Sequence, residues 1–523
     1  MPKLTIDQRE VEVPSGATIL YAARRLGIDI PALCFLEGCE PSTSCLCCLV
    51  KVNGAQRLVP SCATVAEEGA KVESETAEVN SARRQALELL LSDHLGDCVA
   101  PCYLACPAEM DIPLMLRQIS SGDLRGAIAT VKHDIALPAV LGRICPAPCE
   151  KICRRHDLDT AVAICLLKRY VADVDLASGN PYLPPCQTSS GKKVAIIGGG
   201  PTGLSAGYYL ARAGYACTVF DENDRPGGRL WRETTPEELP RDVLAVEIAQ
   251  ITRLGVELKL KNRVGSYESL QELKKSFDAV LIACGTTARD QAQVWGLKTT
   301  ERGIQVFSHT FQTDLPNVFA AGNAVRSNGL VVRSVADGKQ SAVAIDQYLR
   351  GQVVIGADRP FNTKIGRMGK EELHRFASGA TMEPRRDPAA GMQDGFDADQ
   401  AAVQASRCMH CDCRALHSCK LRKYADLYGA DTRRYKGQRR EFEQDANHTD
   451  VIYEPGKCID CGLCIQIAAA AGESLGLTFI GRGFDVRVAV PLDRHLDEAL
   501  RQVAAKCAGA CPTGALVMKD NKS

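Results

Sequence analysis

The sequence has no excess of charge of either sign and no long apolar run. Its 523 residues carry 63 Lys and Arg against 63 Asp and Glu, so nothing favours nucleic acid or an anionic lipid surface as a partner. The start, MPKLTIDQRE, lacks the charged-then-apolar layout of a secretion signal, and no apolar run is long enough to span a bilayer. We therefore expect a cytoplasmic chain whose 45% hydrophobic residues form the cores of several domains.

The sequence also lacks a recognisable nucleophile, acid–base pair or substrate pocket, so we predict no catalytic residue. Cysteine, in contrast, is abundant at 25 residues. A long chain without a secretion signal has little use for a disulfide framework, so thiols at short spacings indicate zinc or iron–sulfur clusters. Buried structural cysteines would explain the isolated Cys186, Cys217 and Cys284, but not the runs.

Residues 1–78 are expected to form a [2Fe–2S] domain. KLTIDQREVEV reads as two short strands around a turn, and GATILYAARRLGI has helical apolar spacing. A loop with three thiolates plus one from a following segment suits a [2Fe–2S] cluster, with zinc as the alternative; Cys39 and Cys47 stay unassigned. The loop and SCATVAEEG resemble the β-grasp, ferredoxin-like domain of the complex I large subunit and of iron-only hydrogenases. The predicted ligands are Cys34, Cys45, Cys48 and Cys62.

Residues 79–185 are expected to be helical and to hold two [4Fe–4S] clusters. The segment has seven thiols, whereas two such clusters need eight ligands. His94, four residues before Cys98, is either the missing ligand or a helix-end histidine. The complex I large subunit has a similar His-x3-Cys pair, and an imidazole ligand would raise the potential of its cluster.

CPAEMDIP and GRICPAPCEKIC resemble the N-terminal domain of the glutamate synthase small subunit and of dihydropyrimidine dehydrogenase. In that family the two halves of the domain share the clusters, and relatives have Glu or Gln at the position of Cys165. Carried across, the resemblance implies one cluster on Cys98, Cys102 and Cys153, and a second on Cys106, Cys145, Cys149 and Cys165.

Residues 186–356 are expected to form a Rossmann-like FAD domain. KKVAIIGGGPTGLSAGYYLARAGYACTVFDEND reads as strand, Gly-rich turn, helix and strand, the context in which G-x-G-x-x-G binds a dinucleotide. Two further stretches, DRPGGRL and NVFAAGNAVRSNGLVVRSVADGKQSA, resemble FAD motifs of the glutamate synthase family, although Asn323 stands where Asp is usual. The expected contacts are Gly198, Gly200, Gly203, Asp221 or Glu222, Gly228, Arg229, Gly322 and Asn323.

A second nucleotide-binding unit is missing from the pattern. The glutamate synthase relatives insert an NAD(P)H-binding domain where this chain has residues 288–314. That stretch holds no G-x-G-x-x-G and is too short for a βαβ unit of roughly 30 residues. We therefore predict that the flavin exchanges electrons with clusters and that any nicotinamide binds a partner subunit.

The tail contains two more groups of cysteines. Residues 357–440 are polar and punctuated by Pro and Gly, which predicts an extended linker. Its run C-x2-C-x-C-x5-C, Cys408, Cys411, Cys413 and Cys419, fits one [4Fe–4S] cluster or zinc. Residues 441–523 resemble a half-degenerate bacterial ferredoxin, in which Ala468 replaces one ligand and Cys507 remains alone. One [4Fe–4S] cluster is expected there, on Cys458, Cys461, Cys464 and Cys511.

Together these patterns predict a multidomain α+β and α/β protein with FAD, one [2Fe–2S] and three to four [4Fe–4S] clusters. The mosaic is similar to the iron–sulfur flavoprotein subunits of soluble NAD-linked hydrogenases and formate dehydrogenases, some of which bifurcate electrons at the flavin. That resemblance implies an NADH/FMN-binding partner, a catalytic hydrogenase or formate dehydrogenase subunit, and a ferredoxin. The alternatives are a free-standing NAD(P)H oxidoreductase of the glutamate synthase type and an iron–sulfur carrier protein.

Overall fold

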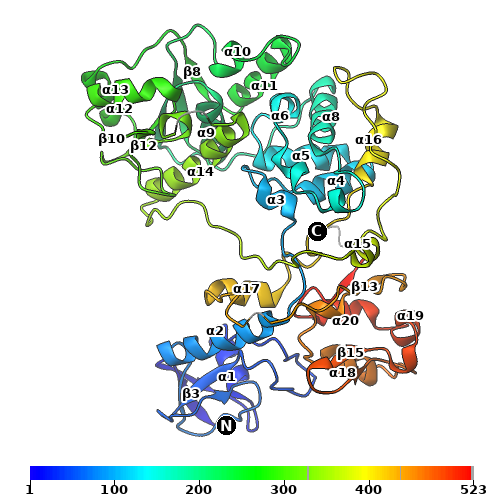
Figure 1. Ribbon diagram of the computed structural model, residues 1–523. Helices are drawn as coiled ribbons and strands as arrows, with labels where there is room; N and C mark the ends of the chain where they lie inside the picture. Colours follow the sequence, from blue (N-terminus) through cyan, green and yellow to red (C-terminus); the bar gives the residue numbers. More distant parts are fainter. Residues whose placement is uncertain (327–328, 436, 520–523) are drawn as a thin grey trace. The chain divides into compact units, whose positions relative to one another are not determined.

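The computed structural model describes residues 1–326, 329–435 and 437–519, apart from the side chains of residues 287–289 and 484. These residues divide into two compact units (Figure 1). Unit 1 contains residues 1–100, 360–378 and those from 410 onward, and unit 2 contains residues 101–359 and 379–409. Unit 2 is therefore inserted in sequence between parts of unit 1.

Unit 1 begins with a five-stranded mixed sheet in the order β2-β1-β5-β3-β4. The predicted hairpin is confirmed, since β1 (Lys3–Ile6) pairs antiparallel with β2 (Arg9–Glu12) and Leu4 and Ile6 are buried on one face. The predicted helix is α1 (Ile19–Arg25), capped by the Thr18 hydroxyl. The other strands are β3 (Leu49–Val52), β4 (Val59–Pro60) and β5 (Lys71–Glu73).

The rest of unit 1 consists of short elements around cysteine-rich loops. Helix α2 (Ala77–Ser92), capped by Thr76, packs against α17 (Lys420–Leu427). Two small antiparallel pairs follow, β13 (Val451–Tyr453) with β16 (Leu516–Met518) and β14 (Thr478–Ile480) with β15 (Arg487–Ala489). The helices here are α15 (Lys370–Phe376), α18 (Leu463–Ala470), α19 (Leu496–Ala499) and α20 (Ala504–Ala510).

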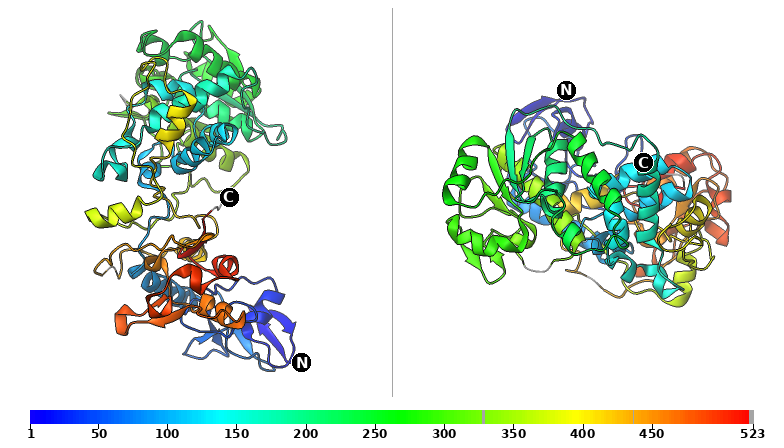
Figure 2. Two further views of the ribbon diagram at one scale, coloured as in Figure 1. Left: turned by 90° about the vertical axis from the view of Figure 1, so that its right-hand side faces the viewer. Right: turned by 90° about the horizontal axis from the view of Figure 1, so that it is seen from above.

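Unit 2 opens with the predicted helical region, drawn in cyan in Figures 1 and 2. Asp111 and Asp123 cap the helices α4 and α5, and leucine, isoleucine and valine side chains fill the space between the helices. Helix α6 ends at the residue before Cys145, and α8 begins at the residue before Cys165. The helices are α3 (Pro101–Ala105), α4 (Ile112–Ser120), α5 (Leu124–Asp134), α6 (Pro138–Ile144), α7 (Pro148–Lys151) and α8 (Ile164–Ala177).

The second half of unit 2 is a parallel sheet in the order β12-β9-β6-β7-β8, as the Rossmann-like pattern predicts. Its strands are largely apolar, as expected where helices cover both faces of a parallel sheet, except for the edge strand β8. They are β6 (Lys193–Ile197), β7 (Ala216–Phe220), β8 (Glu257–Lys259), β9 (Ala279–Ile282) and β12 (Val318–Ala320). The accompanying helices are α9 (Pro201–Arg212), α10 (Arg229–Arg232), α11 (Arg241–Arg253), α12 (Tyr267–Ser276) and α14 (Val331–Leu349). Helix α16 (Ala398–Ala405) packs instead on the helical region, against α4 and α8.

Between β9 and β12 the chain forms only small elements. These are a 3-10 turn at residues 285–287, α13 (Ala288–Val294), and a two-stranded hairpin of β10 (Thr299–Thr300) and β11 (Gly303–Ile304). The segment thus contains no second parallel nucleotide-binding sheet. Across the described ranges, no helix is both long and apolar enough to cross a membrane.

Candidate functional site

The four cysteines predicted for the [2Fe–2S] cluster lie together in unit 1. The Sγ atoms of Cys34 and Cys45 are 3.3 Å apart, as are those of Cys48 and Cys62, and all four residues are buried. A hydrogen bond between the latter two thiols lowers the pKa of Cys48 to about 7 and raises that of Cys62. The Cys47 thiol points elsewhere and donates to the Cys45 carbonyl at 3.2 Å.

The C-terminal ligand candidates also gather in unit 1, beside the [2Fe–2S] loop. Burial raises the pKa of Cys461 to about 12, and the neighbouring Cys511 adds to the shift. Ser42, from the [2Fe–2S] loop, donates its hydroxyl to the carbonyl of Cys461 at 3.0 Å. Glu40 in the [2Fe–2S] loop and Gln466 in α18 form reciprocal hydrogen bonds, so the two cysteine groups belong to one packed body.

A third group in unit 1 combines cysteines from both ends of the sequence. The backbone N–H of Cys413 donates to the Cys98 carbonyl at 3.0 Å, and the Cys98 Sγ lies 3.4 Å from Thr363 Oγ1. Burial raises the pKa of the Cys419 thiol to about 12, and the charges of the nearby Cys413 and Cys98 add to the shift. Cys419 caps α17 through its sulfur.

His94 is packed next to this third group. The N–H of Leu95 donates to the Gly456 carbonyl at 2.6 Å, which fixes the His94 segment beside Lys457. Burial and the positive charge of Lys457 lower the pKa of His94 to about 4, which leaves the imidazole neutral. Its Nδ1 atom is buried and has no hydrogen-bond partner, the state expected of a nitrogen that binds a metal.

In unit 2, the predicted set of four thiols lines a single cavity. Cys145 ends α6, Cys149 lies in α7 and Cys165 lies in the first turn of α8, so three helix ends converge. The Cys165 N–H donates to the Glu150 carboxylate at 2.9 Å. The cysteines on the cavity wall are Cys106, Cys145, Cys149 and Cys165.

Lys168 lines the same cavity and is 5% exposed. Burial alone would lower the pKa of Lys168, but the negative charge of the four cysteines outweighs it and raises the pKa. Among the described residues no carboxylate forms an ion pair with Lys168. Lys457 differs, because its ammonium pairs with the buried Glu454 and lies 3.9 Å from the Cys413 Sγ. Sequence patterns gave no indication of either lysine.

Three predicted ligands, Cys102, Cys153 and Cys408, remain in unit 2, whereas Cys411 belongs to unit 1. The predicted sets Cys98–Cys102–Cys153 and Cys408–Cys419 therefore each draw on both units. No three His, Cys, Asp or Glu side chains of the described residues converge closely enough for a single metal ion. Zinc at the Cys408–Cys419 run thus finds no support, whereas ligands of a cluster surround several metal atoms and lie farther apart.

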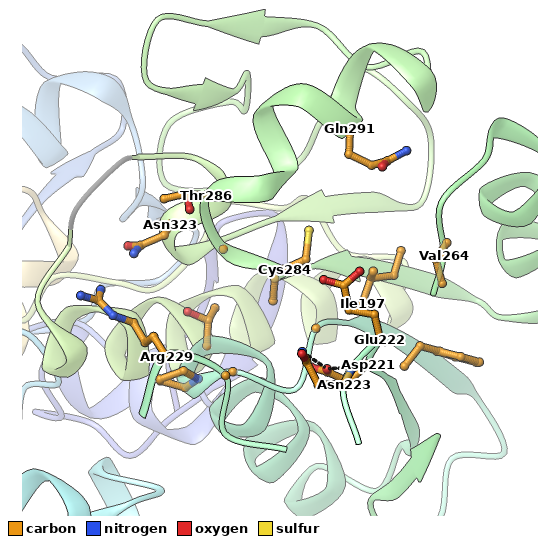
Figure 3. Close-up of a pocket in the computed structure, with 18 of the residues that line it drawn as sticks. Ile197, Asp221, Glu222, Asn223, Arg229, Val264, Cys284, Thr286, Gln291 and Asn323 are labelled. Carbon is orange, nitrogen blue, oxygen red and sulfur yellow. Dashed lines mark hydrogen bonds between the residues drawn. The ribbon is translucent and has the colours of Figure 1, made fainter. Parts of the chain in front are cut away.

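The flavin pocket lies at the carboxyl ends of β6 and β7 and has a volume of about 450 Å³ (Figure 3). Gly198 has φ +107°, and a Cβ there would lie 2.6 Å from the Ala283 carbonyl oxygen; a Cβ on Gly203 would lie 1.9 Å from that of Gly198. Both positions therefore require glycine. Gly228, at φ +53°, also lines the pocket, and a Cβ there would lie 3.1 Å from the Gly200 Cα.

The two acidic candidates of the pocket differ in their surroundings. The Asp221 carboxylate accepts the Gly199 N–H at 2.6 Å and the Asn223 N–H at 2.8 Å, so it holds the turn. Glu222 lines the pocket and pairs with Arg263 at 3.5 Å. Figure 3 shows Glu222 on the side of the pocket opposite Arg229.

The remaining flavin candidates form the other wall. Gly322 has φ +68°, and a Cβ there would meet the Thr202 hydroxyl at 2.2 Å. The Asn323 amide oxygen accepts the Gly329 N–H at 3.2 Å, and Arg229 donates to the Gly329 carbonyl. Ser327 and Asn328, part of the same motif, lie outside the described residues. Arg232, Asn262, Arg263, Trp295 and Ser334 also line the pocket and were not predicted.

Comparison with protein families gives three matches along the chain. Residues 2–77 match a 2Fe-2S iron-sulfur cluster binding domain. Residues 72–180 match dihydropyrimidine dehydrogenase domain II, 4Fe-4S cluster, and residues 164–338 match pyridine nucleotide-disulphide oxidoreductase. The chain carries a [2Fe–2S], a [4Fe–4S] and a flavoprotein oxidoreductase domain. These matches confirm the predicted fold class and the predicted types of cofactor.

Curated relatives are similar over part of the chain. A region of 218 residues, 38% of this chain, is 41% identical to the NADP(+)-dependent formate dehydrogenase subunit beta of Moorella thermoacetica and covers 31% of that protein. The NADPH-Fe(3+) oxidoreductase subunit beta of Geobacter sulfurreducens is 36% identical over 40% of this chain and 31% of its own length. The matched region thus spans about a third of these relatives.

Two further similarities complete the comparison. The NAD-dependent dihydropyrimidine dehydrogenase subunit PreT of Escherichia coli is 38% identical over 36% of this chain and 46% of its own length. A solved NAD+-reducing [NiFe]-hydrogenase aligns with 99% of this chain and 88% of its own, at 12% identity and a TM-score of 0.36. At that score the alignment supports no argument about function.

Proposed function

We propose that this chain is the electron-transfer subunit of a cytoplasmic multi-subunit oxidoreductase and exchanges electrons between FAD and iron–sulfur clusters. The observation that carries the proposal is the presence, in one chain, of a glycine-lined flavin pocket and several separate groups of buried thiols. Flavins take part in hydride chemistry, and iron–sulfur clusters in one-electron chemistry. A chain that binds both connects the two.

We assign each cofactor to one group of residues. The glycine turn around Gly198, with Asp221 or Glu222, would hold FAD, supported by Gly228, Arg229 and Asn323. The [2Fe–2S] cluster would take the four thiols from Cys34 to Cys62, and one [4Fe–4S] cluster the four on the cavity of Lys168. A further [4Fe–4S] cluster would take Cys458, Cys461, Cys464 and Cys511.

The packing in unit 1 supports a relay role. The [2Fe–2S] loop bonds directly to the loop of Cys461, and the Lys420 N–H donates to the carbonyl of Pro512, next to Cys511. The residues around Cys419 therefore contact the C-terminal cysteine group, which contacts the [2Fe–2S] group in turn. Three neighbouring thiol groups in one compact body are the arrangement that stepwise single-electron transfer requires.

The partners are part of the proposal. The segment between β9 and β12 offers one short helix and one hairpin, which favours a nicotinamide site on an NADH/FMN-binding partner. The relatives' names, a formate dehydrogenase beta subunit and an NADPH-Fe(3+) oxidoreductase beta subunit, favour separate partner subunits, and the first favours a catalytic subunit for formate. A hydrogenase subunit is the alternative catalytic partner that the sequence resemblance implies. A ferredoxin would be the third reactant if the flavin bifurcates electrons.

Bifurcation has its own test. In the assembled complex, ferredoxin reduction should stop when the coupled exergonic acceptor is omitted. Ferredoxin reduction that continues without that acceptor would contradict this part of the proposal and leave the relay role intact.

Cofactor content separates the proposed function from an iron–sulfur carrier. The full chain, purified and reconstituted anaerobically, should contain one FAD and about 14 to 18 iron atoms, for one [2Fe–2S] and three to four [4Fe–4S] clusters. Dithionite should bleach the flavin absorbance as well as the cluster absorbance. A chain that retains iron but binds no FAD would refute the proposal in favour of the carrier.

A further inference from the structure

The run from Cys408 to Cys419 crosses the boundary between the two units. The segment of residues 379–409, which we call the strap, belongs to unit 2, and the chain continues in unit 1 from His410. The spacing of the run suggests one four-thiolate cluster. The packing on either side of the boundary indicates otherwise.

Buried arginines fasten the strap to the helical part of unit 2. The guanidinium of Arg407, which is fully buried, donates to the carbonyls of Glu383 at 2.8 Å and Ala161 at 3.2 Å and pairs with Asp159 at 3.1 Å. Arg155 donates in return to the carbonyls of Thr381 and Arg407, both at 3.0 Å. The strap helix α16 also packs against α4 and α8.

This anchoring brings Cys408 to the other thiols of the helical region. Cys408 is buried and follows Arg407 directly, while Cys153 lies two residues before Arg155, the donor to the Arg407 carbonyl. Helix α3, which contains Cys102, packs against α7, which ends two residues before Cys153. Cys102 and Cys153 border the same apolar core to which Cys408 belongs.

The later cysteines of the run have different neighbours. Cys413 donates its N–H to Cys98, its Sγ faces Lys457, and a Cβ on Gly514 would lie 2.4 Å from that Sγ. Cys419 lies close enough to Cys413 and Cys98 to interact electrostatically with both. His94, whose Nδ1 lacks a hydrogen-bond partner, lies four residues before Cys98 and beside the same Lys457.

We propose that the run serves two [4Fe–4S] clusters: Cys408 binds one with Cys102 and Cys153, and Cys413 and Cys419 bind the other with Cys98 and His94. The second set of four lies entirely in unit 1, and the three thiols of the first set all lie in unit 2. The inference rests on the proposed function, because both sites presuppose iron–sulfur clusters.

Serine variants of the reconstituted full chain test this grouping. Cys408→Ser and Cys102→Ser should abolish the same electron paramagnetic resonance signal in the reduced chain, with a loss of about four irons. Cys413→Ser and Cys98→Ser should abolish a second signal and leave the first intact. Cys186→Ser, an exposed cysteine outside every set, is the control and should retain both signals.

Double variants keep the test decisive if a single variant loses more than one cluster. Cys102→Ser with Cys408→Ser should lose no more iron than either single variant, whereas Cys408→Ser with Cys413→Ser should lose twice as much. One shared signal for Cys408 and Cys413, with no added loss in the double variant, would overturn the inference. Failure of the proposed function looks different, because the unmodified chain would then lack FAD, or form no clusters at all, whatever the grouping of its cysteines.

His94 gives an independent readout. His94→Cys should keep all the iron but shift the midpoint potential of the second cluster downward, since imidazole ligation raises potentials. His94→Ala should weaken only the signal that Cys98→Ser abolishes. An unchanged potential and signal in both variants would remove His94 from the site.

Discussion

Neutralising Lys168 should lower the reduction potential of one cluster. The Lys168 side chain shares a cavity with four predicted ligands, and among the described residues no carboxylate forms an ion pair with it. Two unit charges 4 Å apart interact by about 4 kcal/mol at an effective dielectric of about 20, hence by about 2 kcal/mol at twice that distance. A tenfold change in an equilibrium constant corresponds to about 1.4 kcal/mol, or to about 59 mV for a one-electron couple. Lys168→Met should therefore lower the midpoint potential of this cluster by roughly 80 mV.

The assay is a potentiometric titration followed by electron paramagnetic resonance on the reconstituted full chain. Lys168→Arg keeps the positive charge. Its midpoint potential should differ from that of the unmodified chain by only a small fraction of the shift seen in Lys168→Met. The signals of the unit 1 clusters serve as internal controls and should not move. An unchanged midpoint in Lys168→Met, or loss of the same cluster in both variants, would refute the electrostatic reasoning.

Three further predictions follow from the packing. Gly203→Ala places a Cβ 1.9 Å from the Gly198 carbonyl oxygen and should abolish FAD retention measured by absorbance, whereas Gly207→Ala on the same helix should retain FAD. Cys507→Ala should lose no iron in a colorimetric assay, because that cysteine is fully buried beside the Cys464 carbonyl as a core residue. Burial raises the pKa of Glu247 to about 7, although the Ala139 and Val140 N–H groups bonded to its carboxylate oppose the shift. Glu247 therefore contributes about 3 kcal/mol to the free energy of unfolding below about pH 4.5, and this contribution is lost as the pH rises through 7. Glu247→Gln should accordingly flatten the pH dependence of the thermal unfolding midpoint.

Local patterns predicted the elements that local forces determine. The alternation of apolar and polar residues predicted β1 and β2, and the Gly-rich turn between an apolar strand and a helix predicted β6, α9 and β7. The glycines of that turn were identifiable because only glycine fits where Gly198 and Gly203 approach other backbone atoms. Family matches then confirmed the types of domain.

Long-range packing was beyond such patterns. Nothing in the spacing of Cys408 shows that Arg407 and Arg155 fasten the strap to the helical region. The partnership of Cys98 with Cys413 joins residues more than 300 positions apart, so no run of cysteines could reveal it. Lys168 was missed for a related reason: only the convergence of three helix ends turns an ordinary helical lysine into the buried cation of a thiol cavity.

In the proposed role, the flavin of this chain exchanges electrons with clusters, while any nicotinamide is bound elsewhere. An anaerobic titration of the isolated, reconstituted chain with NADH and NADPH, followed by dithionite, tests it directly through the flavin absorbance. We expect that neither nucleotide bleaches the flavin and that dithionite does. Bleaching by either nucleotide alone would contradict it and make a free-standing NAD(P)H oxidoreductase the better description.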